Sequence, residues 1–225
     1  MKSKLRKVLP GLAAGLLVAG CGSNVRLDPP TIPAPLVNSM PLHVVVRIPD
    51  QLQHFTHTES VIGNDEWTID LGRSNAVFFE QLFGYMFDKV TVVGPEDDAS
   101  LVEFDALIEP SIDAFEFSVP AQTKSEAFAV WIRYRIQLYD PQGQLVGNYP
   151  VSAYGKSLTT LMGGDEALQR AAVLAMRDAA ALMIIRFDPD EFLRVLSRGA
   201  QANGVGTDES AAAATATAND GGSDE

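Results

Sequence analysis

The stretch AFAVWIRYRIQLY, residues 127–139, alternates apolar and more polar side chains over its whole length. One face carries Phe128, Val130, Ile132, Tyr134, Ile136 and Leu138. The other carries Ala129, Trp131, Arg133, Arg135, Gln137 and Tyr139. Such alternation is typical of a strand in an antiparallel sheet with one face on the core. The sequence DPQG that follows, residues 140–143, predicts a type I turn, so residues 145–158 are expected to return as the paired strand.

Further strands and helices flank this hairpin. β-Branched runs predict strands at 42–48, 67–71 and 89–93, and a long one at 102–119 with a bulge or edge position near Pro110. Apolar residues at helical spacing predict helices at 75–87 and 165–187, and a short one at 191–196. We therefore expect an α+β fold: an antiparallel sheet of about 4–6 strands, with two main helices packed on one face.

The N-terminus has the three zones of a signal peptide, predicted over residues 1–20. Four basic residues precede an apolar run of about a dozen residues, which is shorter than the roughly 20 that a spanning helix needs. The run closes on VAGC, residues 18–21, which resembles the lipobox of bacterial lipoproteins. This resemblance implies cleavage before Cys21, diacylglycerol on its thiol and a further acyl chain, such as palmitate, on its amine. The alternative is a cleaved secretory signal with an incidental cysteine.

The resemblance also implies a compartment. Inner-membrane lipoproteins typically carry aspartate at the position that Gly22 holds here, so we expect the outer membrane, with the protein on its periplasmic face. Cys21 is the only cysteine, which excludes an intramolecular disulfide. Apart from this covalent lipid, we expect no cofactor.

Composition divides the rest of the chain. Residues 21–41 carry five prolines and predict an extended tether, reaching at most about 60 Å. Residues 42–198 are expected to form a single α+β domain. Residues 199–225 contain five acidic residues and no basic ones, and predict a disordered acidic tail. A net charge of −12, more negative once the basic signal peptide is removed, argues against nucleic acid as a partner.

A His-x-x-His pattern lies in the polar segment at 51–71. His54, His57 and Glu59 are the only candidate metal ligands, because imidazole and carboxylate groups at this spacing can hold zinc. The flanking residues favour an extended conformation or a loop. Solvated imidazoles are therefore the ordinary interpretation, and a zinc site is the alternative.

Two arginines on the polar face of residues 127–139 suggest a binding surface. Arg133 and Arg135, with Trp131 and Tyr139, could contact lipid phosphates or an acidic partner. The alternative is cross-strand pairing with Glu109, Asp113 or Glu116.

An aromatic stripe of Phe78, Phe79 and Phe83 also has two interpretations. It either lines an apolar groove or fills the core.

The chain contains no G-x-S-x-G sequence, no Walker loop and no cysteine pair, so we expect no enzyme. The order of predicted elements resembles the small periplasmic α/β lipoproteins of Gram-negative envelopes. These include auxiliary lipoproteins of ABC-type lipid transporters, the LPS-assembly lipoprotein and the YajG-like lipoproteins. The resemblance implies a non-catalytic accessory component of an envelope complex, in lipid transport or outer-membrane assembly. Two alternatives stay open: a lipid- or LPS-binding carrier with an apolar groove, and a metal-binding periplasmic protein. The oligomeric state stays undefined.

Overall fold

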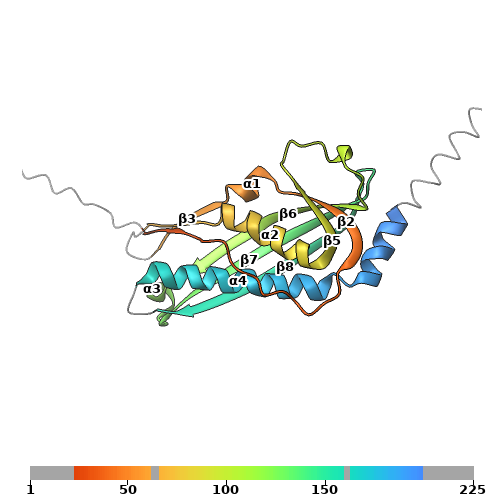
Figure 1. The fold of residues 1–225 in the computed structure, drawn as a ribbon. Helices are drawn as coiled ribbons and strands as arrows, with labels where there is room; N and C mark the ends of the chain where they lie inside the picture. The colour runs from red at the N-terminus through yellow and green to blue at the C-terminus, as the bar shows by residue number, and fades with distance from the viewer. Residues whose placement is uncertain (1–22, 62–65, 160–162, 200–225) are drawn as a thin grey trace, which may run out of the picture.

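The computed structural model describes residues 23–61, 66–159 and 163–199. The predicted signal peptide, Cys21 and all but the first residue of the predicted tail lie outside these residues. The described chain forms two sheets, with helices packed against the larger one (Figure 1). None of the helices in these ranges is both long enough and apolar enough to cross a bilayer.

The larger sheet has five strands in the order β5-β2-β6-β7-β8. They are β2 (Met40–Arg47), β5 (Phe87–Val93), β6 (Ala106–Ser118), β7 (Ala127–Tyr139) and β8 (Leu145–Leu158). The predicted α+β class is confirmed, but the sheet is mixed rather than wholly antiparallel. β6, β7 and β8 form an antiparallel meander, whereas β2 pairs in parallel with both β5 and β6. The connections through helix and loop return the chain to the same end of the sheet, which is what a parallel pair requires.

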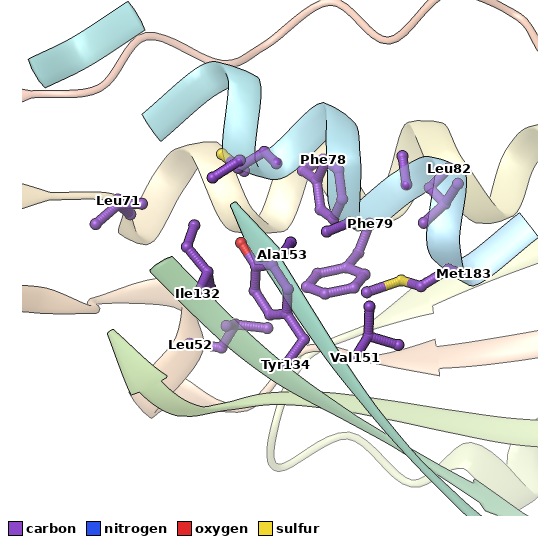
Figure 2. Close-up of a cluster of buried hydrophobic side chains, with 14 of the residues drawn as sticks. Leu52, Leu71, Phe78, Phe79, Leu82, Ile132, Tyr134, Val151, Ala153 and Met183 are labelled. Carbon is purple, nitrogen blue, oxygen red and sulfur yellow. The ribbon is translucent and has the colours of Figure 1, made fainter. Parts of the chain in front are cut away.

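Two long helices cover one face of this sheet, as predicted. α2 (Gly72–Met86) and α4 (Gly164–Arg186) lie side by side on it (Figure 1). Phe78, Phe79 and Phe83 of α2 are fully buried. Figure 2 shows Phe79 against Tyr134 of β7, with ring centroids 5.2 Å apart. The aromatic stripe is therefore core, and the groove that we considered along it is filled.

α4 approaches β8 backbone to backbone because Gly155 has no side chain. A Cβ at this position would lie 2.0 Å from the carbonyl oxygen of Ala171 and 2.4 Å from the amide nitrogen of Ala175. Both alanines lie on the small-residue face of α4 and are fully buried. The alanine-rich face and the glycine together allow this close contact.

A bulge in β6 explains its change of face. The register with β7 shifts between Ile112 and Ala114, so Asp113 is the extra residue. Ala106 and Ile108 face the core before it, and Phe115 and Phe117 face the core after it. We expected the irregularity near Pro110, which instead pairs regularly with Ile136.

The smaller sheet has the order β1-β4-β3. β1 (Ser23–Arg26) runs parallel to β4 (Glu66–Asp70), which pairs antiparallel with β3 (Thr56–Ser60). Trp67 of β4 packs on Phe128 of β7, with ring centroids 5.5 Å apart. Short helices α1 (Asp50–Gln53), η1 (Ala99–Leu101) and α3 (Pro120–Thr123) complete the connections, and residues 189–199 form a last helix.

The N-terminal segment differs from the extended tether that we expected. Its described part begins in β1, and residues 27–39, here called the strap, cross α2 and α4 (Figure 1). Leu27 and Ile32 of the strap are each only 4% exposed. Ser74 donates a hydrogen bond to the carbonyl of Leu27 at 2.6 Å, and Arg177 donates to that of Thr31 at 3.2 Å. The amide of Leu27 still donates to the carbonyl of Asp70 in β4 at 2.9 Å, but the strap then leaves the sheet, where proline's missing N–H costs no ladder hydrogen bond.

Candidate interaction surface

The face of the five-stranded sheet opposite α2 and α4 is open over β6, β7 and β8. One end of this face is closed, because Ala99 and Phe104 of the β5–β6 connection pack on Val45 and Leu107. Tyr139 joins this cluster. Burial first, and then the charge of Glu109, raise its pKa, while Arg47 opposes that effect. Of the four predicted binding residues, Tyr139 is therefore the one that the β5–β6 connection partly covers.

An exposed aromatic pair lies on the open part of the face. Trp131 of β7 is directly opposite Tyr154 of β8. Their ring centroids are 5.1 Å apart, and the two residues are 44% and 42% exposed. Cross-strand aromatic contacts hold both rings in place at small entropic cost. Rigid, half-exposed aromatic groups are typical anchors of protein interfaces.

A shallow hollow of about 270 Å³ borders the aromatic pair. It is lined by Ala114, Glu116, Trp131, Ile132, Arg133, Ser152 and Ala153. Small side chains form its floor, while an acidic and a basic group stand at its rim. This size suits one inserted side chain of a partner rather than a whole lipid. We call Trp131, Tyr154, Arg133 and Glu116 the open patch.

The bulge residue Asp113 pairs with both arginines. Arg135 donates to its carboxylate through Nε at 2.9 Å and through Nη2 at 2.5 Å. Arg133 lies further away, with Nε 3.8 Å from the same carboxylate, and its side chain is 54% exposed. The hydrogen bonds from Arg135 hold the pKa of Asp113 below its usual value; burial opposes this effect, and the positive charges of Arg135 and Arg133 add to it. Arg135 is thus engaged within the sheet, while about half of the Arg133 side chain stays exposed.

Replacing Asp113 by asparagine should lower stability at neutral pH and have little effect in acid. A carboxyl group whose pKa is lower in the folded state stabilises the fold above its unfolded pKa of about 3.9, and that contribution is lost as pH falls through the folded value. Urea unfolding midpoints of wild type and Asp113→Asn should therefore differ at pH 7, and the difference should shrink progressively as the pH falls below the unfolded pKa. A difference that stayed constant from pH 7 into the acid range would contradict the ionic origin of the effect.

The predicted histidine site is divided between two elements. His54 ends α1, and its Nδ1 lies 3.1 Å from the carbonyl oxygen of Asp50. His57 of β3 packs against Phe115 and Phe117, and its Nε2 lies 3.5 Å from Glu59. Throughout the described ranges, no three His, Cys, Asp or Glu side chains converge as a metal site would require.

An apolar hollow of about 360 Å³ also lies at the end of α4 away from Gly164. The strap lines one side through Leu36, Val37 and Met40, and Ile184 and Phe187 line the other. Leu36 is fully exposed, so the hollow is open to solvent.

Sequence comparisons give this chain no family. No protein-family model matches it, and no curated protein matches it in sequence. Solved structures with local likeness include a lipoprotein from Caulobacter crescentus CB15, at 13% identity and a TM-score of 0.35, covering 58% of this chain and 85% of that one. Uncharacterized lipoprotein B from Nitrosomonas europaea gives 11% identity and a TM-score of 0.36, covering 68% and 88% of the two chains.

A third solved structure is a homolog of neuraminyllactose-binding hemagglutinin from Helicobacter pylori. It gives 12% identity and a TM-score of 0.43, with 77% of this chain and all of that chain covered. The neighbours thus include lipoproteins, but all three scores are too low to establish a common fold or function.

Proposed function

We propose that this chain is a non-catalytic, lipid-anchored protein of the outer membrane that assists an envelope complex, in lipid transport or in outer-membrane assembly. Its anchor would be Cys21, and its partner a protein that binds the open patch. The observation that carries the proposal is the uncovered sheet face, where Trp131 and Tyr154 contact each other and are each almost half exposed. A partner that inserts an apolar side chain into the adjacent hollow and an acidic group toward Arg133 fits this surface.

The carrier alternative has less support. The groove that we considered for it would run along Phe78, Phe79 and Phe83, and these side chains fill the core. A bound acyl chain would have to displace them.

The double variant Trp131→Ala/Arg133→Glu should fold normally but lose its partner. Both side chains are about half exposed, so the substitutions remove only the contact with Tyr154 and the outlying ion pair with Asp113, at a cost of about 1–2 kcal/mol that the fold should tolerate. We would crosslink the acylated protein in its own membranes and identify the proteins that co-purify. A defined set should be captured by wild type and reduced at least tenfold in the variant.

The matched control is Leu101→Ala/Leu193→Ala, which removes exposed apolar side chains at other sites. It should capture the same proteins as wild type. Equal capture by both double variants would overturn the role of the open patch. Acylation of Cys21, read from the mass of the N-terminal peptide, tests the anchor separately.

A further inference from the structure

The start of β1 lies almost at the predicted anchor. Ser23 is two residues after Cys21, and an extended chain spans at most about 3.6 Å per residue. Cys21 therefore lies within roughly 7 Å of a residue that is fixed in a sheet. A flexible tether over residues 21–41 would have allowed about 60 Å.

Ser23 is firmly joined to the body. It pairs with Trp67 in the parallel ladder of β1 and β4, and Val25 is 4% exposed. The carbonyl of Arg26 accepts a hydrogen bond from Gln169 of α4 at 3.4 Å. The strap then continues the attachment through its bonds to Ser74 and Arg177, so lifting the body away from the anchor would require breaking first β1 and then the strap.

Several other elements begin or end close to the start of β1, at one end of the molecule. β4 and α4 begin there, next to Phe128 near the start of β7: a Cβ at Gly164 would lie within about 3 Å of both Trp67 and Phe128. β8 ends there as well, because Leu158 pairs with Ala127. In Figure 1 the start of β1, α3 and the end of β8 all lie at this left-hand end, and the last helix lies at the opposite end.

We propose that this end, presented by Leu158, Lys156 and Lys124, rests directly on the bilayer surface. The inference rests on the proposed lipid anchor at Cys21. Leu158 is 64% exposed, and both lysines are exposed. Glu126, Asp165 and Glu166 are exposed at the same end and offset the lysines, so the acyl chains rather than charge supply the affinity.

If Leu158 rests on the bilayer, the open patch must also lie close to the bilayer surface. Tyr154 is four residues from Leu158 along β8, or about 14 Å at strand spacing, whatever the tilt of the sheet. A partner that binds the open patch would therefore be seated in or on the same membrane.

The orientation can be measured with one fluorophore at a time. Acylation blocks the thiol of Cys21, so a new cysteine in the mature, acylated chain is the only reactive thiol. We would label Leu158→Cys with NBD and place the protein in vesicles of phosphatidylethanolamine and phosphatidylglycerol that contain a headgroup spin-labelled lipid. The matched position is Leu101→Cys, 84% exposed in η1, at the far end of β6, whose 13 residues span about 40 Å.

The spin label should quench fluorescence at position 158 at least threefold, and should leave position 101 unchanged. Inserting twelve Gly/Ser residues between Gly22 and Ser23 gives the anchor about 20 Å of slack and should reduce quenching at position 158. Equal quenching at both positions, in acylated and vesicle-bound protein, would overturn this inference and leave the anchor intact. A Cys21 peptide without acyl mass would overturn both the anchor and the inference.

Discussion

Adding a single methyl group at Gly155 should be among the most destabilising substitutions in this protein. In Gly155→Ala the new Cβ would lie 2.0 Å from the carbonyl oxygen of Ala171. Backbone atoms cannot turn aside as a side chain can, so α4 would have to move off β8. Overpacking typically costs about 1–3 kcal/mol, and a backbone clash belongs at or above the top of that range. Chemical denaturation, read by circular dichroism, measures the loss.

Gly84→Ala is the control for this prediction. Gly84 lies inside α2, and a Cβ there meets no atom within 4 Å. Alanine is the better helix former by about 0.8–1.0 kcal/mol, so this variant should gain stability. If Gly155→Ala were as stable as wild type, the close contact of α4 and β8 would be contradicted.

Truncating Phe79 to alanine should cost about 3–5 kcal/mol. Its ring is fully buried and contacts three others, with centroid distances of 4.9 Å to Phe78, 5.7 Å to Phe83 and 5.2 Å to Tyr134. Helix and sheet are both fixed around this cluster, so the cavity cannot close fully. The denaturation midpoint should fall with little change in the slope of the transition.

Trp131→Ala is the matched comparison, because it removes a larger aromatic side chain from the open face. It should lower the free energy of unfolding by about 1 kcal/mol, because it removes the aromatic contact with Tyr154, and so by much less than Phe79→Ala. A similar loss in Phe79→Ala and Trp131→Ala would mean that the aromatic stripe of α2 does not form the core.

The antiparallel half of the fold was predictable because its signals are local. Strict alternation and the turn at residues 140–143 define β7 and β8 at their observed limits. Helical spacing places α2 within three residues of its observed start. The parallel pairs of β2 were missed, since each joins strands far apart in sequence and leaves no periodic signal.

The strap was missed for a different reason. Prolines and absent periodicity are typical of a linker, and they do not reveal isolated residues such as Leu27 and Ile32 that fit pockets on the body. Ser74, in the first turn of α2, lies buried and donates to the strap. Its role depends on a residue 47 positions away.

The sequence predicts which residues of β7 face outward in the candidate site, but not which residue of β8 lies beside them. Alternation places Trp131 and Arg133 on the outer face, but not Tyr154 beside Trp131. A turn closed between Asp140 and Gly143 would put Ser152 opposite Trp131, whereas the observed register, with its shift between Leu138 and Tyr139, puts Tyr154 there. The contact of Arg135 with Asp113 was among the alternatives, and the bulge at Asp113 is what brings the carboxylate within reach.

The strap also sets the order in which the chain can mature. Arg177 and Gln169 of α4 donate to the carbonyls of residues 31 and 26, so the attachment of the N-terminal segment is complete only once the last long helix has been made, over 140 residues later. Contacts between such distant segments form late, because closing a long loop has an entropic cost. β1 can pair with β4, and Leu27 can accept from Ser74, before α4 exists, whereas the contacts with α4 can form only afterwards, so the N-terminal segment is attached to the body in two stages.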